Sequence, residues 1–488
     1  MNLSMKAIEL FVFWYPAIMS AMWMAGAVIF YFYNERGKAL PLNETPFVSI
    51  LVPCFNEAGT IENTLRQLSK LEYPNYEIIV INDGSKDNTS QVVNRILDRY
   101  PKARFIDLKE NCGKANALYL GLIASKGEIL VGVDSDSYIM PDALNYMIPH
   151  FTNKHNGERV GAVTGNPRVR NRSSLLAKIQ LCEYASIISL IKRTQRIWGK
   201  VMTVSGVVVA FRKRALIDAE LWDRDMITED IGVTWKLEKK FWDVRYEPRA
   251  LCMMLVPESI KGIAKQRERW TKGGMEILRR HFNIFKTWKE RRLFPVYMEQ
   301  ICSIVWSFCW LIMLVLIIYN LIFRRTYIQM PYIWKCLFLS SVCLVQFAVA
   351  MLLDRKYDPK LMRHAIVAIW YPFVYWYINA LIVIKSLPSL FKRKGKLATW
   401  QSPDRGIGTK ADWDNVVTLR EDAFVPFGER VVIKKYRPKG AGVVKVHSKV
   451  EPRVENNIFG EGYFEASSID SLMNDFGASS GNKYRLKR

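Results

Sequence analysis

Four long stretches of the chain contain no charged side chain. They are 18 to 24 residues long and occupy residues 10–33, 301–323, 336–353 and 365–384. About 20 apolar residues in a helix cross the hydrocarbon core of a bilayer, and four such stretches rarely coincide as buried helices of a soluble protein. The pattern predicts an integral membrane protein, with a transmembrane helix at 8–33 and a membrane region of about three helices at 295–387.

Between the first two stretches, short apolar runs alternate with helical segments. The runs expected to form strands are 47–53, 76–82, 104–108 and 128–134, and the helices between them are 60–71, 88–100 and 113–125. Strands that are almost wholly apolar and separated by helices predict βαβ units, with a parallel sheet covered on both faces. The expected architecture is an α/β domain at 46–255, inserted between transmembrane helices.

Acidic residues directly follow two of these strands. Asp83 ends the run at 76–82, and Asp134 and Asp136 form an Asp-x-Asp sequence after the run at 128–134. Ligands of such sheets bind at the carboxyl ends of the strands, and an Asp-x-Asp there can hold a divalent cation that bridges a diphosphate. The alternative is that Asp-Gly-Ser and Asp-Ser-Asp are ordinary turn sequences. No dinucleotide-binding or P-loop glycine motif is present.

Two further groups of polar residues precede the second apolar stretch. Glu229 and Asp230 come just before a helical run at 231–239, so Asp230 is either a helix N-cap or a general base. Gln266, Arg269 and Trp270 have the spacing that places them on one helical face. An arginine there can bind phosphate bidentately. The same segment, 256–294, is basic and amphipathic, as expected of helices at a membrane surface.

The charges flanking the apolar stretches predict the orientation of the chain. Arg36 and Lys38 follow the first stretch and only Lys6 precedes it, so the positive-inside rule places the domain at 46–255 in the cytoplasm. Eight scattered cysteines without a CxxC pair fit that reduced compartment. Three later spans would put the following basic run outside the cell. Either one C-terminal stretch is re-entrant, with the last one suspected because of Pro372, or the chain is an exception to the rule.

The net charge of +24 is concentrated in three segments. Residues 168–200 carry eight Lys or Arg and one Glu, residues 258–292 carry eleven and four acids, and residues 385–488 carry twenty and twelve. We expect anionic lipid headgroups, rather than nucleic acid, to be the partner of these segments. The basic, polar tail at 388–488 has candidate strands at 431–436 and 442–447, and a weakly folded tail is favoured over a regulatory module.

The motifs Asp-Gly-Ser, Asp-x-Asp, Thr-Glu-Asp and Gln-x-x-Arg-Trp follow one another on a single domain between membrane spans. In that order they resemble the processive inverting glycosyltransferases, which include cellulose, chitin and hyaluronan synthases. Residues 161–168, 182–195, 225–230 and 399–406 resemble the branch that makes bacterial poly-β-1,6-N-acetylglucosamine. The resemblance covers about residues 8–408. It implies a GT-A-like nucleotide-sugar domain, UDP-N-acetylglucosamine as donor, a growing polysaccharide as acceptor, Mg²⁺ or Mn²⁺ as cofactor, and a role in the biofilm matrix.

The resemblance also implies roles for residues on the donor side. Phe55 and Glu57 would hold the uracil and its surroundings, and Phe55 keeps the stacking of the more usual tyrosine without its hydroxyl. Asp83 would contact the nucleoside, and Lys114 would approach the donor. Asp134 would bind the donor and Asp136 the metal ion.

The remaining roles concern transfer. Asp230 would deprotonate the acceptor hydroxyl, with Glu229 beside it among the catalytic residues. Ser205 and Gly206 would line the acceptor path. Three residues would hold the diphosphate and the acceptor end: Gln266, Arg269 and Trp270.

A single displacement at the anomeric carbon needs only one base, because no covalent sugar–enzyme intermediate forms. Four spans are few for a wide channel, so a small membrane partner subunit is expected. The alternatives are a chitin- or hyaluronan-type synthase with a different linkage or donor, and a membrane-anchored binding or scaffold subunit whose carboxylates are turn residues.

Overall fold

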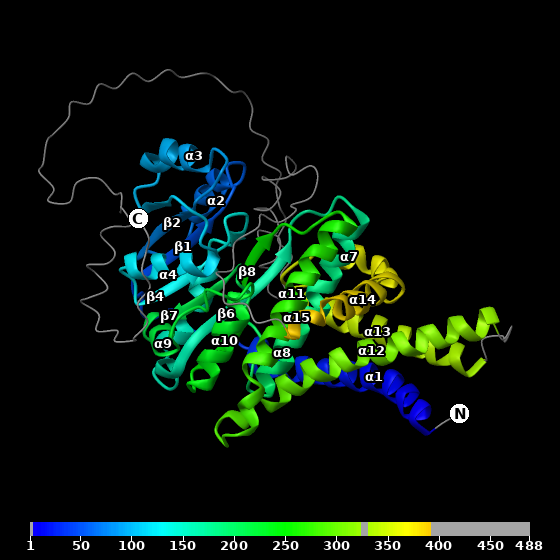
Figure 1. The fold of residues 1–488 in the computed structure, drawn as a ribbon. Coiled ribbons are helices and arrows are strands. Elements are labelled where there is room, and N and C mark those ends of the chain that lie inside the picture. Colours follow the sequence, from blue (N-terminus) through cyan, green and yellow to red (C-terminus); the bar gives the residue numbers. More distant parts are fainter. Residues whose placement is uncertain (1–2, 324–329, 392–488) are drawn as a thin grey trace, which may run out of the picture. The chain divides into compact units, whose positions relative to one another are not determined.

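The structure is a computed structural model that describes residues 3–323 and 330–391 (Figure 1). Nearly all of the basic tail, including its two candidate strands at 431–436 and 442–447, lies outside the described residues. The described residues form one α/β domain and a set of long apolar helices.

The first half of the domain is the predicted series of βαβ units. Its four parallel strands are adjacent in the order β3-β2-β1-β4: β1 (Val48–Cys54), β2 (Tyr76–Asp83), β3 (Ala103–Leu108) and β4 (Ile129–Gly132). The helices between them are α2 (Ile61–Leu68), α3 (Thr89–Ile96) and α4 (Lys114–Ala124). Every residue of β1, β2 and β4 is buried. Alternate residues of β1 enter the hydrophobic clusters on opposite faces of the sheet, with Ile50 in one and Leu51 in the other.

The second half of the sheet is mixed, which corrects the expectation of an all-parallel sheet. Its strands are β5 (Tyr138–Ile139), β6 (Val160–Val169), β7 (Val209–Arg212) and β8 (Asp243–Met254). They continue the sheet as β4-β7-β6-β8-β5, and β7 is antiparallel to both of its neighbours (Figure 1). Val209, the first residue of β7, pairs with Gly132, the last residue of β4. The chain therefore enters β7 from the carboxyl end of β4, so the preceding loop lies where ligands are expected to bind.

Short helical elements complete the domain. They are α5 (Ala143–Met147), α6 (Pro149–Thr152), α9 (Lys213–Asp218) and α10 (Glu229–Lys239), with 3₁₀ turns at Leu97–Arg99 and Gly157–Arg159. The helices that connect it to the apolar region are α7 (Leu175–Glu183), α8 (Leu190–Ile197) and α11 (Ile260–Arg280), with a π-helical turn at Tyr184–Ser189 and 3₁₀ turns at Phe282–Phe285 and Glu290–Leu293.

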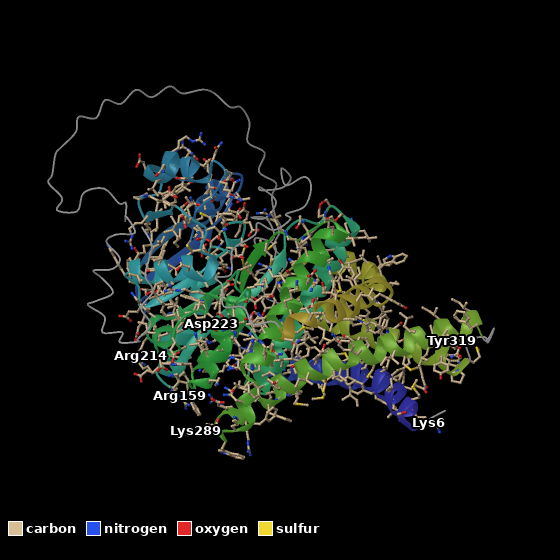
Figure 2. The ribbon with its side chains drawn as sticks, viewed as in Figure 1. Lys6, Arg159, Arg214, Asp223, Lys289 and Tyr319 are labelled. Carbon is tan, nitrogen blue, oxygen red and sulfur yellow. The ribbon has the colours of Figure 1, made fainter. Side chains whose placement is uncertain are left out.

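Three helices of the described residues are long and apolar enough to cross a membrane. They span Ser4–Glu35, Glu290–Phe323 and Met330–Asp354 and correspond to α1 (Leu3–Phe30), α12 (Phe294–Phe323) and α13 (Met330–Asp354). Helix α1 packs against both α12 and α13 (Figure 1). Lys289 precedes one end of α12, and Tyr319 lies near the other end (Figure 2).

The fourth apolar stretch is not a straight helix. It is divided into a 3₁₀ segment at Leu361–Ile369, a π-helical turn at Tyr371–Tyr375 and α14 (Trp376–Ser386), followed by α15 (Pro388–Phe391). Pro372 has no N–H to donate within this stretch, which favours an interruption of regular helix there. Within the described part of the chain, two long helices therefore follow the α/β domain, and the stretch suspected of being re-entrant is interrupted.

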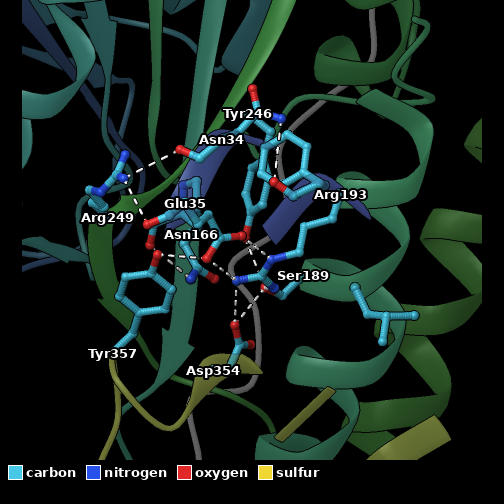
Figure 3. A network of polar contacts seen from close by, with 12 residues as sticks. Asn34, Glu35, Asn166, Ser189, Arg193, Tyr246, Arg249, Asp354 and Tyr357 are labelled. Carbon is cyan, nitrogen blue, oxygen red and sulfur yellow. Dashed lines mark hydrogen bonds and ion pairs between the residues drawn. The ribbon is translucent and has the colours of Figure 1, made fainter. Parts of the chain in front are cut away.

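A buried ion network joins the end of α1 to the domain (Figure 3). The Arg193 guanidinium lies 2.5 Å from a Glu35 carboxylate oxygen and 2.8 Å from an Asp354 carboxylate oxygen. Tyr357 donates to the Glu35 carboxylate, and Arg168 lies 2.6 Å from the other Asp354 oxygen. These ion pairs have side-chain exposures of 0–1%. The network fixes α8, α13 and strand β6 to the end of the first apolar helix.

The buried arginines also correct part of the charge interpretation. Arg168, Lys192, Arg193 and Arg267 belong to the basic segments expected to meet lipid headgroups, yet each is at most 8% exposed. Three of them are ion-paired in the interior. Those cations are therefore not available to headgroups.

Candidate active site

Four functional groups predicted from the sequence meet at the carboxyl end of β4. The Lys114 ammonium lies 2.6 Å from Asp134 Oδ1 and 3.0 Å from Glu229 Oε1. A Cβ added to Gly206 would lie 3.4 Å from both Asp230 Oδ2 and Lys114 Nζ. All five residues line one pocket. Segments from α4, β4, α10 and the loop before β7 thus converge on one site, although they are up to 116 residues apart in the chain.

Asp83 holds the turn that presents Lys114. Its two carboxylate oxygens accept from the backbone N–H groups of Cys112 and Gly113, at 2.9 and 2.8 Å. Gly113 precedes α4 with φ 93°, a left-handed conformation that glycine adopts without strain. Burial raises the pKa of Asp83 despite these two hydrogen bonds. The predicted nucleoside contact would have to use the remaining lone pairs of this carboxylate.

Phe55 and Glu57 lie in the turn between β1 and α2. Both are buried, at 8% and 1% exposure. Thr60 donates to the Glu57 carboxylate at 2.5 Å, and the Glu57 amide donates to Thr89 Oγ1 at 2.8 Å. This turn lies at the carboxyl end of β1, next to the end of β2 that carries Asp83. Phe55 and Glu57 are thus on the side of the site where the resemblance expects the nucleoside.

Asp136 is the residue to which the sequence assigns a metal ion. Burial raises its pKa to about 6, and the neighbouring Asp134 carboxylate adds to this effect. Ser137 donates to Asp136 Oδ1 at 3.2 Å. Within the described part of the chain, no group of three or more His, Cys, Asp or Glu side chains is arranged to hold a metal on its own. Asp136 and the neighbouring Asp134, whose charge raises the pKa of Asp136, fit a divalent cation whose other ligands come from a bound diphosphate.

Asp230 is the second residue of α10, not its N-cap, which is Thr228. Its Oδ1 accepts from the backbone of Ile231 at 3.0 Å. Burial raises the pKa of Asp230 to about 6, the Glu229 carboxylate adds to the rise, and Lys114 and Arg269 oppose it. In Lys114, burial lowers the pKa, but Asp134 and Glu229 together raise it above its ordinary value. Asp230 therefore has the properties of a base that is ionised near neutral pH and readily accepts a proton.

Gly273 allows the Gln-x-x-Arg-Trp helix to approach Asp230. A Cβ at Gly273 would lie 2.0 Å from Thr228 Oγ1, so only glycine lets α11 pack directly on the start of α10. Arg269, one turn earlier, is exposed and close enough to lower the pKa of Asp230. Gln266 and Trp270 are partly buried on the same helix. The structure thus brings the Thr-Glu-Asp and Gln-x-x-Arg-Trp motifs to adjoining helices.

The site belongs to a chain that matches known proteins over most of its length. Residues 45–273 match the family described as glycosyltransferase like family 2. The chain is 44% identical over 416 residues to the poly-β-1,6-N-acetyl-D-glucosamine synthase of Staphylococcus epidermidis, which covers 81% of this chain and 98% of that protein. It is 44% identical over 410 residues to the synthase of the same name from Staphylococcus aureus strain MSSA476, with the same coverage. The chain belongs to glycosyltransferase-like family 2.

A solved structure also aligns with this family 2 chain. It is the mannosyltransferase PcManGT from Pyrobaculum calidifontis in complex with GDP-Man and Mn²⁺, with a TM-score of 0.49 and 18% identity over 77% of this chain and 98% of that chain. The family match confirms both the resemblance inferred from the four motifs and the expected GT-A-like α/β fold.

Several residues that hold the Gln-x-x-Arg-Trp helix in place were not predicted from the sequence. Arg267, inside the Gln-x-x-Arg-Trp motif, points into the protein and lies 2.5 Å from a Glu183 carboxylate oxygen. Tyr371 donates to the other oxygen of Glu183 at 3.1 Å, and the Arg267 guanidinium lies 4.5 Å from the centre of the Trp270 ring. Gln266, Arg269 and Trp270 are spaced so that they share one face of the helix. The same spacing places the intervening Arg267 on a different face, so its inward orientation could have been recognised from the sequence.

The loop before β7 is held by side chains from three elements. The backbone N–H groups of residues 201, 202, 204 and 205 donate to Glu238, Gln195, Thr234 and Thr164 at 2.8–3.0 Å. Lys192 Nζ donates to Ser205 Oγ at 2.5 Å. This loop of the family 2 domain carries both predicted acceptor-path residues, Ser205 and Gly206. Nothing in its local sequence identifies these distant partners.

Proposed function

We propose that the protein is a membrane-embedded processive glycosyltransferase that polymerises N-acetylglucosamine from UDP-N-acetylglucosamine into a β-1,6-linked exopolysaccharide of the biofilm matrix. The observation that carries this proposal is the 44% identity that extends over 98% of a poly-β-1,6-N-acetyl-D-glucosamine synthase, and thus beyond the family 2 domain at 45–273. The convergence of Lys114, Asp134, Glu229 and Asp230 supplies the chemistry such a reaction requires.

The acceptor hydroxyl attacks the anomeric carbon of the donor while its proton passes to Asp230. The carbon–oxygen bond to UDP breaks in the same displacement, and the configuration at that carbon inverts. Burial and Glu229 raise the pKa of Asp230 to about 6, which makes its carboxylate a stronger base than an ordinary aspartate. Glu229 supports this role through its charge and through its ion pair with Lys114.

Negative charge develops on the leaving diphosphate, and cationic groups at the site offset it. Arg269 is exposed on α11 near Asp230, and Lys114, which lines the pocket, is held by Asp134 and Glu229. Asp136, with Asp134 beside it, would hold Mg²⁺ or Mn²⁺. The cation would supply a Lewis acid that neutralises the diphosphate oxygens.

The membrane arrangement follows from the three candidate spans. One lies before the catalytic domain and two lie after it, so the described residues that follow Asp354 lie on the side of the catalytic domain. With that domain in the cytoplasm, the basic run after the last apolar stretch is also cytoplasmic, in accordance with the positive-inside rule. Membrane lipids surround the helices, and a small membrane partner subunit would complete the path of the polymer.

The decisive experiment uses the full chain in membranes or lipid nanodiscs. UDP-[¹⁴C]N-acetylglucosamine with Mg²⁺ or Mn²⁺ is expected to give a labelled polymer that a β-1,6-specific glycosidase degrades and a chitinase does not. A polymer digested by chitinase, or one that requires UDP-glucuronate, would instead identify a chitin- or hyaluronan-type synthase. Donor binding without any transfer would identify a binding or scaffold subunit and refute the proposal.

A further inference from the structure

Helix α8 carries two neighbouring buried cations with different surroundings. Arg193 is paired with Glu35 and Asp354. Lys192 is 6% exposed, yet in the described ranges 3–323 and 330–391 no carboxylate oxygen lies within ion-pair distance of its ammonium. Its one hydrogen bond in those ranges goes to Ser205 Oγ, at 2.5 Å. Because an ammonium has three donors, two N–H groups of Lys192 are left for a ligand.

The ligand of Lys192 must lie close to Asp230. Ser205 precedes Gly206, and a Cβ added to Gly206 would lie 3.4 Å from Asp230 Oδ2. Burial lowers the pKa of Lys192 to about 7, and the Asp230 carboxylate opposes this effect. The proposed base therefore has one lysine from α4 near it, Lys114, and a second from α8, Lys192.

The two lysines suit different substrates. Lys114 is held by the carboxylates of Asp134 and Glu229, beside the Asp-x-Asp sequence that would bind the donor diphosphate. Lys192 contacts a neutral hydroxyl on the loop of the predicted acceptor path. A buried ammonium without an ionic partner is costly unless its donors are satisfied, and the hydroxyl and ring oxygens of a neutral sugar are suitable acceptors.

We propose that Lys192 binds the terminal sugar of the acceptor polymer, with Ser205 orienting its ammonium, so that the attacking hydroxyl is held at Asp230. This inference rests on the proposed function and assigns it an acceptor-binding residue. The ion pairs of Arg193, the next residue on α8, anchor the backbone that carries Lys192. The position of Lys192 relative to Asp230 is thus set by the buried network at the end of α1 (Figure 3).

The test compares acceptor use with donor use in the full chain in nanodiscs. Transfer from UDP-N-acetylglucosamine is measured against increasing concentrations of a β-1,6-linked N-acetylglucosamine oligosaccharide. UDP release without acceptor and UDP-N-acetylglucosamine binding are measured in parallel. Lys192→Met is expected to lower kcat/KM for the oligosaccharide by at least about 30-fold, since it removes hydrogen bonds from a charged donor. The donor Kd and the slow hydrolysis should stay within about threefold of wild type, and Lys192→Arg should restore part of the transfer.

Lys200→Met is the matched control. Burial also lowers the pKa of Lys200, but its charged neighbours are Glu238, Arg292, Asp243 and Arg196 rather than Asp230. Its kcat/KM for the oligosaccharide should stay near that of wild type. Ser205→Ala is a milder second variant in case Lys192→Met fails to fold, and it is expected to raise the acceptor KM by about three- to tenfold without changing the donor Kd.

Three outcomes would overturn the inference. They are wild-type kcat/KM for the oligosaccharide in Lys192→Met, an equal loss of donor binding and hydrolysis in that variant, or an unchanged acceptor KM in Ser205→Ala. A wild-type protein that binds the donor but makes no polymer would refute the proposed function itself, whatever the variants do.

Discussion

As the pH is lowered, sugar transfer should be lost at a higher pH than it would be if the base were an aspartate of ordinary pKa. Burial and the Glu229 carboxylate raise the pKa of Asp230 to about 6, whereas an unperturbed aspartate has a pKa of about 3.9. The base must be ionised to accept a proton, so activity is present above the raised pKa and is lost as the pH falls through it. At pH 5, about one in eleven Asp230 side chains remains ionised, and kcat should be about tenfold below its value at pH 7.5. With an unperturbed pKa the same change of pH would lower kcat by less than about 10%.

Two substitutions should move the acidic limb of the pH–rate profile, the pH range in which the rate falls as the pH is lowered, in opposite directions. Glu229→Gln removes the neighbouring negative charge that raises the pKa of Asp230, so the limb should move to lower pH. Lys114→Met removes a positive charge that lowers this pKa, so the limb should move to higher pH. Arg269 and Lys192, the other cations near Asp230, are unchanged in both variants. The maximal rate at high pH will differ between these variants and wild type because both residues contact the site. The comparison therefore uses only the pH at which the rate is half of its maximum.

The assay measures the initial rate of UDP release at saturating UDP-N-acetylglucosamine, from pH 4.5 to 8 at constant ionic strength. The metal ion is kept saturating because burial and Asp134 raise the pKa of Asp136 to about 6 as well, and a bound cation holds that carboxylate ionised. A rate that does not change between pH 5 and 7.5 would refute the assignment of Asp230 as a base with a raised pKa. So would a limb that moves to higher pH in Glu229→Gln.

Four further predictions concern single positions. Asp230→Asn should lower polymer synthesis by about 10²- to 10⁴-fold while the donor Kd measured by calorimetry stays within about threefold; wild-type synthesis would exclude Asp230 as the base. Asp136→Asn should lose the metal-dependent part of donor binding, and EDTA should weaken donor binding in wild type but not in this variant. Gly273→Ala places a Cβ 2.0 Å from Thr228 Oγ1 and should lower the free energy of unfolding, measured by thermal denaturation, by about 1–3 kcal/mol, with a loss of transfer. The control is Gly274→Ala, whose added Cβ meets only the Gln300 side chain at 3.3 Å. Equal effects of the two substitutions would contradict the packing argument. Arg193→Met leaves two carboxylates buried without their arginine and should lower the free energy of unfolding by about 3–5 kcal/mol. Arg196 is partly exposed, and Arg196→Met should lower it by about 1 kcal/mol or less. Equal unfolding midpoints of the two variants would show that the network contributes no stability.

The local pattern of apolar residues was sufficient to predict an element where its segment is buried irrespective of the segments that surround it. The predicted strands at 76–82 and 104–108 differ by one residue at one end from β2 and β3. Every residue of β2 is buried, so its apolar run has no solvent-facing alternative, whereas β3 has an exposed Asp107 and only two fully buried residues. Asp83, Asp134 and Asp136 could be expected at one edge of the sheet, since the carboxyl ends of parallel strands lie together. Glu229 and Asp230 were correctly placed near the start of a helix, but only the structure shows both within its first turn.

Other features depend on residues that are distant in the chain. The segment 168–200 is basic by composition, yet Arg193 pairs with Glu35, 158 positions away, and Lys192 donates to Ser205 in the loop before β7. The close contact between Gly273 and Thr228 likewise cannot be recognised from either local sequence. Neither strand β7 nor its antiparallel direction was predicted, because the direction of a strand is set by where the preceding loop is anchored and not by its own apolar residues.

The sequence by itself determined the membrane character, the first four strands of the sheet, the order of the four motifs and the acidic residues at the strand ends. These follow from local hydrophobicity and from chemistry carried by neighbouring residues. Only the tertiary structure decided which cations are buried and how Lys114 is shared between Asp134 and Glu229. The physical reason is that burial and charge pairing are properties of the space around a side chain, and that space is filled by segments from the whole chain.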